Sequence, residues 1–302
     1  MKVFVTGATG VMGRAAVAAL VDAGHDVAGL ARSEEKAEVL RSAHVEPVDA
    51  NLFNADTLAT AFVGYETVLN LATHIPVGYA GIRPGAWRVN DRIRTQGSRI
   101  VAEAALTAGV HRLVQESVSY IYADGGDDWL DEQSPLAVTR VTEPVAVAEL
   151  NAQSFAGAGR SVVVLRFGSL IGDEGFTRWR LARARAGQPI GIGDPDGWSH
   201  VLHTDDVGDA VLASLEAPGG VYNVGAEPVS RSELASELAR AAGRERSSFL
   251  PKMMVRLAGD RVEPLTRSHR ISSATFMTTV GWVPRHPVFG AAWLDGISVD
   301  GS

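Results

Sequence analysis

The sequence predicts an α/β fold in which helices cover both faces of a doubly wound parallel sheet. Two observations support this prediction. Short β-branched runs alternate with helix-length stretches over the first half of the 302 residues, as they do where helical crossovers join parallel strands. A glycine-rich turn, VTGATGVMG, includes the end of the first of these runs and opens the first helix.

The expected elements alternate as far as Phe167. We expect strands at KVFVT, DVAGLA, VEPVD, TVLNLA, RLVQES and SVVVLRF. The helices expected between them span residues 12–23, 34–41, 55–62, 88–108 and 143–156. Apolar strands separated by helices of this length need burial on both faces, which predicts a parallel sheet between two helical layers.

The alternation loosens after Phe167. A turn-rich loop, GQPIGIGDPDGW, precedes one more strand–helix unit, HVLHTDDVGDAVLASLE, and the short strand GVYNVG. Ser230 and Glu233 form a capping box for a further helix. We therefore expect residues 1–167, completed by about residues 200–224, to form the sheet domain. Residues 168–199 and 225–302 are expected to form a smaller C-terminal α+β portion that binds the substrate.

The composition excludes several classes of protein. The chain has no cysteine, which excludes disulfides, thiolate metal sites and a cysteine nucleophile. A net charge of −7 disfavours nonspecific nucleic-acid binding, and no apolar run approaches the roughly 20 residues of a membrane span. MKVFVTGATG enters a strand directly, without the features of a signal peptide, so we expect a cytoplasmic protein without nucleic-acid or membrane partners.

The glycine-rich turn predicts a dinucleotide site in a Rossmann-type fold. Gly7, Gly10 and Gly13 are spaced so that one allows a tight turn and another lets backbone amides approach a pyrophosphate. The third lets the helix pack close to the sheet. The cofactor would also contact the neighbouring residues of the same turn, Thr9, Val11 and Met12. A plain glycine turn without a ligand is the alternative.

The end of the second strand bears on the choice of cofactor. NAD sites usually carry Asp or Glu here to hold the ribose diol, whereas this chain has Arg32 followed by Ser33. A guanidinium suits the additional 2′-phosphate of NADP through bidentate, charge-assisted hydrogen bonds. NADP is therefore the expected cofactor, with NAD as the alternative if Arg32 instead pairs with Glu34 or Glu35.

These motifs together resemble the extended branch of the short-chain dehydrogenase/reductase superfamily, which contains the NAD-dependent epimerases and dehydratases. The resemblance covers nearly the whole chain and rests on TGATGVMG, NLAT, DEQSP, VVVLRFGSLIG, HTDDV and VYNVG. It implies a small-molecule substrate and a homodimer joined through helices. The further cofactor contacts that it implies are Asp49 and Ala50 near the adenine, Leu71, Ala72 and Thr73 beside the ribose, and also Asn90 and Ser117.

The chain departs from this family where proton transfer is expected. Family members use a tyrosine held by a lysine four residues later, in the helix before VVVLR; the corresponding positions here are Val141 and Val145. Neither Tyr nor Lys occurs between Ala123 and Phe167. The serine or threonine that accompanies the pair is also missing, because Val118 takes its place.

Other groups near the expected nicotinamide position are candidates for proton transfer. The candidate catalytic groups are Ser117, Ser119, Tyr120, Tyr122 and His74. A core tyrosine and a solvent-exposed histidine are the alternatives for the last three.

The remaining polar groups suggest neither a metal site nor a firm substrate site. His200 and His203 lie close to Asp205 and Asp206, but the histidines are three apart on an expected strand and should face opposite sides, so we predict no metal site. Arg231, Arg267 and Arg270 could hold a substrate phosphate or carboxylate, although surface arginines are the default in this arginine-rich chain.

The sequence thus predicts an NADP-binding oxidoreductase or epimerase-like enzyme that works without the Tyr–Lys pair. Two alternatives stay open. One is an NADP-binding sensor or partner protein that does not turn over hydride, and the other is a lyase or cyclase on the same fold.

Overall fold

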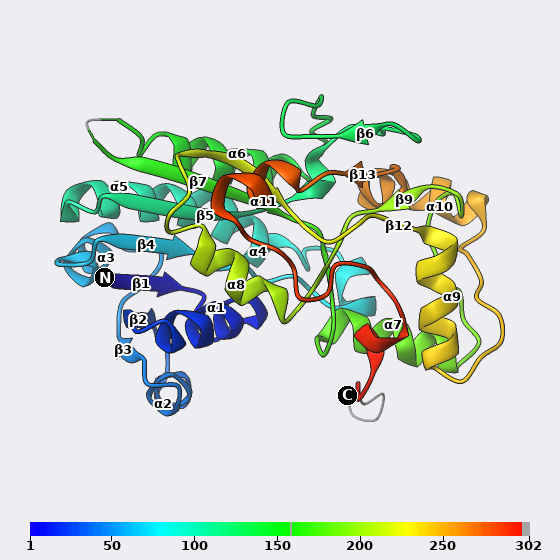
Figure 1. Ribbon diagram of the computed structural model, residues 1–302, viewed down its shortest axis with the longest axis horizontal. Coiled ribbons are helices and arrows are strands. Elements are labelled where there is room, and N and C mark those ends of the chain that lie inside the picture. Colours follow the sequence, from blue (N-terminus) through cyan, green and yellow to red (C-terminus); the bar gives the residue numbers. More distant parts are fainter. Residues whose placement is uncertain (158, 298–302) are drawn as a thin grey trace.

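The computed structural model describes residues 1–157 and 159–297 (Figure 1). Its centre is a sheet of seven parallel strands in the order β11-β7-β5-β4-β1-β2-β3, which confirms the predicted doubly wound sheet. The strands are β1 (Lys2–Thr6), β2 (Asp26–Leu30), β3 (Glu46–Val48), β4 (Thr67–Asn70), β5 (Arg112–Val118), β7 (Ser161–Phe167) and β11 (Gly220–Val224).

Two apolar clusters hold helices to the two faces of the sheet. Side chains alternate along β1, so Val3 and Val5 pack into one cluster and Phe4 into the other. The first cluster joins the sheet to α1 (Val11–Asp22), α2 (Glu34–Ser42), α8 (Asp206–Ala213) and α11 (Ala274–Val280). The second joins it to α3 (Ala55–Phe62), α5 (Ser98–Ala108) and the end of α6 (Glu143–Gln153).

The long helix expected over residues 88–108 is interrupted. It consists of α4 (Arg88–Arg92), a π-helical turn at Ile93–Gly97, and α5. Tertiary contacts accompany this wider turn: Arg94 pairs with Glu116 of β5 at 2.8 Å, and Asn151 of α6 donates to the Thr95 carbonyl oxygen at 2.9 Å. Periodicity alone does not reveal such an interruption, because the residues on both sides remain helical.

The smaller part of the chain lies beyond the carboxyl ends of β1 and β4 (Figure 1). Its core packs α7 (Gly175–Arg185) against α9 (Arg231–Ala241), and α10 (Lys252–Ala258) follows. Two short strand pairs connect it to the sheet domain. They are β8 (Ser169–Ile171) with β10 (Val201–His203), and β6 (Trp129–Leu130) with β13 (Arg270–Ile271). A third pair, β9 (Trp198–Ser199) with β12 (Val229–Ser230), lies within the smaller part.

The order of the strands indicates where a ligand would bind. Strand β1 has β2 on one side and β4 on the other, so the direction of winding reverses there. A crevice for ligands in sheets of this kind lies outside the carboxyl ends of the strands at that point. Among the residues that the structure describes, no helix combines the length and apolar character needed to cross a membrane.

Candidate functional site

The turn between β1 and α1 has the shape of a pyrophosphate cradle. Gly7 adopts a φ of +71°, and a Cβ atom there would lie 2.6 Å from the Leu71 carbonyl oxygen. A Cβ atom on Gly13 would lie 2.1 Å from the Gly7 carbonyl oxygen. Helix α1 begins after Gly10 without a side-chain cap, which leaves its first amides available to an anion. The residues present therefore fit a dinucleotide.

The other residues of the turn line this cradle in different ways. Thr9 is half-buried, and its carbonyl oxygen accepts a hydrogen bond from Arg14 Nη1 at 2.8 Å. Val11 is exposed at the start of α1, whereas Met12 is buried beneath it. The Arg14 guanidinium therefore holds the backbone of the turn, while Met12 fixes the helix to the core.

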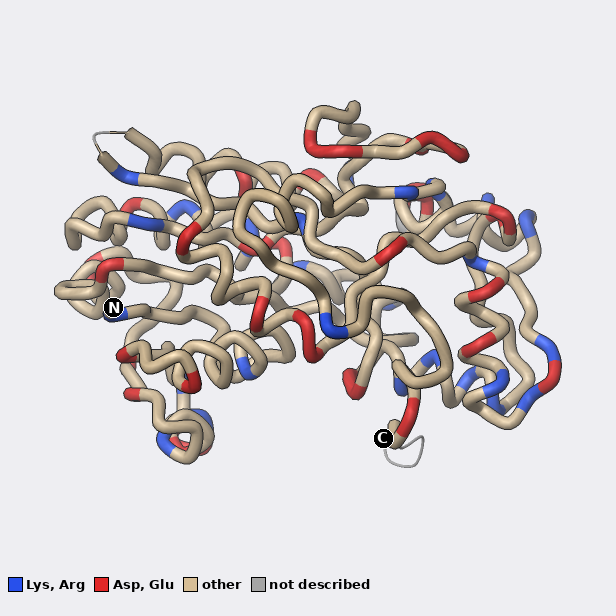
Figure 2. The backbone as a smooth tube through the Cα atoms, in the orientation of Figure 1, with Lys and Arg blue, Asp and Glu red and all other residues tan. Residues whose placement is uncertain are grey.

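Arg32 stands free at the end of β2. Figure 2 shows acidic and basic residues side by side on α2, which begins two residues later. Glu34 pairs with Arg41 at 2.6 Å rather than with Arg32. Arg32 is exposed and has no hydrogen bond or ion pair with any described residue. Arg32 therefore pairs with neither Glu34 nor Glu35 in the structure, contrary to the alternative considered above.

The ends of β3 and β4 provide the other predicted cofactor residues. After β3, Asp49 is exposed and Ala50 is buried. After β4, Leu71 is buried against Gly7, and Ala72 and Thr73 are half-buried.

A buried amide tethers the segment that follows β4. Asn90, in α4, is 4% exposed, and its Oδ1 accepts a hydrogen bond from the backbone N–H of His74 at 3.1 Å. The His74 ring itself is exposed. Asn90 therefore sets where the β4 segment runs.

A buried polar network joins β5, α6, β7 and β11. The Ser117 hydroxyl donates to Glu149 Oε1 at 2.5 Å, and Arg166 Nη2 donates to Glu149 Oε2 at 2.7 Å. Arg166 Nη1 also donates to the Tyr122 hydroxyl at 2.9 Å, which in turn donates to Asn223 Oδ1 at 2.8 Å. Ser117 and Tyr122 are fully buried, and each hydroxyl has its partner within the protein.

The charges in this network are matched. Burial lowers the pKa of Arg166, but the Glu149 carboxylate outweighs it and raises that pKa overall, so the guanidinium stays charged. Burial also raises the pKa of Tyr122 despite the nearby Arg166. The phenol therefore stays protonated at neutral pH.

Apolar residues occupy the region where the resemblance expects the Tyr–Lys pair. Val145 is 6% exposed on the buried face of α6, and Val141 lies in the turn before that helix. Val118 is extended at the end of β5. No phenol or ammonium group is supplied by these three positions.

Tyr120 is a half-buried phenol two residues beyond the end of β5. It lies in a short 3-10 turn, Ser119–Ile121, next to the buried Ser119. Its ring centroid is 6.0 Å from that of His269. Burial lowers the pKa of two buried arginines, Arg180 and Arg231, and electrostatic interaction with Tyr120 partly opposes that effect in both.

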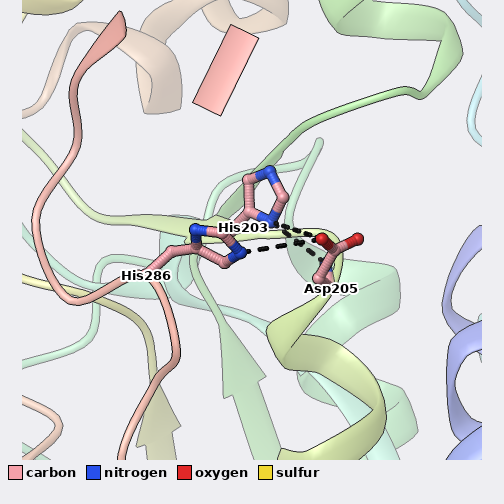
Figure 3. Close-up of side chains that lie close together, drawn as sticks. All are labelled: His203, Asp205 and His286. Carbon is pink, nitrogen blue, oxygen red and sulfur yellow. Dashed lines mark hydrogen bonds and ion pairs between the residues drawn. The ribbon is translucent and has the colours of Figure 1, made fainter. Parts of the chain in front are cut away.

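A second group of titratable residues lies at the start of α8. His203, Asp205 and His286 point toward one another in Figure 3, with Asp205 Oδ2 3.5 Å from His203 Nδ1 and 3.6 Å from His286 Nε2. The backbone N–H of Asp205 donates to His203 Nδ1 at 3.3 Å, so this nitrogen already has a donor. Burial and the nearby His286 lower the pKa of His203, which favours the neutral ring.

Asp206, the residue next to this group, fastens the C-terminal segment to the sheet domain. The Asp206 carboxylate accepts hydrogen bonds from the backbone N–H groups of Arg285 at 2.6 Å and His286 at 3.2 Å. His200 lies elsewhere, buried, with Nε2 3.4 Å from Ser273 Oγ. His286 could not be predicted as a neighbour of this group, because it follows α8 by about 70 residues, too far for a local pattern. The absence of a metal stays a prediction.

The three arginines considered for substrate binding are engaged within the protein. Arg231 donates to the carbonyl oxygens of Asp194 and Arg267. Arg267 pairs with Glu263 at 2.7 Å. Arg270 stacks on the rings of Trp129 and Trp198, with its guanidinium carbon 4.5 and 4.7 Å from the ring centroids.

Comparisons with known proteins agree with the fold and the glycine turn. The NAD dependent epimerase/dehydratase family matches residues 3–225. The chain is 31% identical, over 98% of its length, to a Streptomyces protein named 3-diazoavenalumate denitrifying reductase, of which it covers 99%. MoeE5 in complex with UDP-glucose and NAD is 25% identical, with a TM-score of 0.76 over 97% of this chain and 96% of that chain.

A human structure shares the fold at lower identity. The epimerase family protein SDR39U1 with NADPH has a TM-score of 0.81 at 22% identity, over 99% of this chain and 100% of that chain. The family match spans the phosphate turn, the strands of the sheet and the polar network. The chain therefore belongs to the NAD dependent epimerase/dehydratase family of extended short-chain dehydrogenases/reductases, and it is an NAD(P)-dependent oxidoreductase or epimerase-like enzyme.

Proposed function

We propose that the protein is an NADP-dependent reductase whose acceptor can be reduced without a proton from a Tyr–Lys pair. The proposal is supported by the apolar residues at the two positions where the family resemblance predicts that pair. These residues are Val141 and Val145, and Val145 is buried. The nearby Ser117 hydroxyl donates to Glu149 and is not free to donate to a ligand.

The cofactor part of the proposal rests on the cradle and on Arg32. NADPH, when bound, supplies the hydride. Gly7, Gly10 and Gly13 leave room for its pyrophosphate beside the uncapped start of α1. Arg32 is exposed and unpaired among the described residues, so it is available to a 2′-phosphate.

The remaining predicted cofactor residues lie after β3 and β4, where they could border the adenosine part of the cofactor. We propose that Asp49 and Ala50 border the adenine and that the segment Leu71–Thr73 borders the ribose. Asn90 acts indirectly in this proposal, because its amide oxygen holds the backbone of His74.

Without a Tyr–Lys pair to donate a proton, the enzyme is best suited to an acceptor that needs no proton. A carbonyl oxygen that gains a hydride at its carbon must also gain a proton, and a positioned side chain usually provides it. An aryl diazonium differs: its ring carbon gains the hydride, the carbon–nitrogen bond breaks, and dinitrogen leaves with the bonding electrons. This acceptor already carries the positive charge that the hydride neutralises, so no proton is needed.

One relative supports this class of acceptor. The Streptomyces protein named 3-diazoavenalumate denitrifying reductase matches 98% of the chain. Its name describes removal of nitrogen from a diazo compound by a reductase. We therefore propose an aryl diazonium acid as the substrate of this chain.

A carbonyl acceptor is the second candidate, and the position of Tyr120 favours it. Tyr120 is half-buried, follows β5 directly and lies near two buried cations, Arg180 and Arg231. We propose Tyr120 as the acid in this case, with His74 and Ser119 as the other candidates on the β4 and β5 segments.

Deuterium transfer tests the proposal directly. The purified protein is mixed with 3-diazoavenalumate and with NADPH deuterated at its transferable position. We expect dinitrogen release, oxidation of NADPH and one deuterium on the ring carbon that lost nitrogen. Tyr120→Phe should retain this activity, because the diazonium route needs no proton.

Other outcomes of these assays would favour one of the alternative functions. Turnover of ketones that is lost in Tyr120→Phe would favour the carbonyl route. Tight NADPH binding without oxidation by either class would indicate a sensor. Conversion of a substrate without net oxidation of the nucleotide would indicate a lyase or cyclase.

A further inference from the structure

Arg180 on α7 is a buried cation that lacks a counter-ion among the described residues. It is 9% exposed, and it has no hydrogen bond or ion pair with any residue that the structure describes. Other buried arginines differ in this respect. Each of three has a carboxylate oxygen within 2.8 Å: Arg94, Arg166 and Arg267.

The carboxylate closest in sequence to Arg180 is already engaged. Glu174 precedes α7, and its Oε2 accepts a hydrogen bond from the backbone N–H of Phe176 at 2.6 Å. Its Oε1 accepts one from the backbone N–H of Thr177. Glu174 thus caps the helix, and it interacts with Arg180 only through longer-range electrostatics.

The surroundings of Arg180 are aromatic, and its helix contacts the segment that follows β4. Its guanidinium carbon lies 5.9 Å from the centroid of the Phe176 ring, which stacks on Trp179. Gly78, in the segment after β4, packs against Trp179, so that segment and α7 are in contact. Figure 1 shows α7 beyond the carboxyl ends of β1 and β4, where the cofactor cradle opens.

Tyr120 links Arg180 to the end of β5. Burial lowers the pKa of Arg180 to about 10, and Tyr120 partly opposes that effect. The side chain therefore remains a cation at neutral pH. A buried charge without a counter-ion is strongly unfavourable, and an oxyanion that enters the site relieves the cost.

We propose that Arg180 binds the carboxylate of the substrate and so selects acidic aromatic acceptors, a proposal that rests on the proposed reductase function. A carboxylate suits the site better than a phosphomonoester does. One unpaired guanidinium neutralises one negative charge, whereas a phosphomonoester carries nearly two at neutral pH. The planar fork of a guanidinium also matches the two oxygens of a carboxylate. Phe176 offers an apolar surface for the ring of the same ligand.

Binding of simple acids to the NADP-loaded protein tests this proposal without any hydride transfer. The probes are cinnamate, methyl cinnamate and phenyl phosphate, measured by titration calorimetry. We expect the protein to prefer cinnamate to the other two. Arg180→Met should weaken cinnamate binding about 10–100-fold while leaving methyl cinnamate and NADP binding unchanged.

Matched variants separate binding from folding. Arg178, on the same helix, has a side chain that is 45% exposed and pairs with Asp173 at 3.2 Å, so Arg178→Met should not change cinnamate binding. Arg180→Lys keeps the charge and should bind cinnamate better than Arg180→Met does. Because Arg180→Met removes an unpaired buried charge, it should raise the Tm of the ligand-free protein, whereas loss of a merely structural contact would lower it.

Three results would overturn the proposal. They are equal cinnamate binding in Arg180→Met and the unaltered protein, a preference for phenyl phosphate, and no binding of cinnamate by the unaltered protein. The reductase function can fail separately. If Arg180→Met loses cinnamate binding but no acceptor oxidises NADPH, the carboxylate site stands and the reductase assignment is wrong.

Discussion

Glu149 and Arg166 form a buried ion pair, 2.7 Å between Oε2 and Nη2, that joins α6 to β7. The Ser117 hydroxyl of β5 donates to the same carboxylate. Three elements that meet beside the expected nicotinamide position are thereby held by one carboxylate. The pair stabilises the geometry of the site without presenting a charge to the ligand.

Replacing Glu149 should therefore affect stability strongly. Glu149→Gln leaves the buried Arg166 guanidinium without a full counter-charge, and we expect the free energy of unfolding to fall by about 3–5 kcal/mol. Urea denaturation followed by circular dichroism measures this change. The Arg99–Glu103 pair on α5 provides a control, because its side chains are about half exposed at 51% and 49%.

The control variant should lose little stability. Glu103→Gln removes an exposed helical ion pair and should cost only about 0.3–0.5 kcal/mol. Equal losses in the two variants would mean that Glu149 acts as an ordinary surface carboxylate, contrary to its burial.

The free guanidinium at the end of β2 predicts the cofactor preference. Arg32→Asp removes the partner of a 2′-phosphate and supplies an acceptor for a ribose diol. We expect NADPH affinity to fall about 10–100-fold and NADH to become the preferred nucleotide. Fluorescence titration with each nucleotide measures the change.

A surface arginine on the neighbouring helix controls for general charge effects. Arg41 pairs with Glu34 and Glu38 on α2, so Arg41→Gln should leave the preference for NADPH intact. An unchanged preference in Arg32→Asp would remove the basis for assigning NADP.

The glycine turn could be predicted from sequence because its constraints are local. The positive φ of Gly7 and the close approach of Gly13 to the Gly7 carbonyl oxygen follow from residues within one short segment. The alternation of strands and helices is local as well. These features predicted the sheet and the cofactor cradle.

The substrate side could not be predicted in the same way. Helix α7 carries four arginines, and only packing against the rest of the chain decides that Arg180 is buried while Arg178 is half-exposed. His269 reaches the Tyr122 carbonyl oxygen across 147 positions of sequence. No periodic pattern encodes such contacts, because they depend on how distant segments meet.

Two buried histidines predict a loss of stability on mild acidification. Burial lowers the pKa of His200 to about 3 and that of His269 to about 4, from an ordinary value of 6.5. Arg231 and Arg267 also lower the pKa of His269, while its hydrogen bond to Tyr122 raises it. Both rings are therefore neutral in the folded protein at pH 5, whereas the unfolded chain binds a proton on each.

Because the unfolded chain binds more protons, the folded protein should lose stability as the pH falls. The unfolded state takes up more protons below pH 6.5, so the stability that the neutral rings contribute is complete above that pH and falls toward pH 4. Each histidine should cost on the order of 2 kcal/mol between about pH 7 and pH 5. Urea denaturation at a series of pH values measures the slope. His269→Gln should flatten it, whereas His44→Gln, at an exposed position, should not, and a slope unaffected by His269→Gln would contradict the assignment.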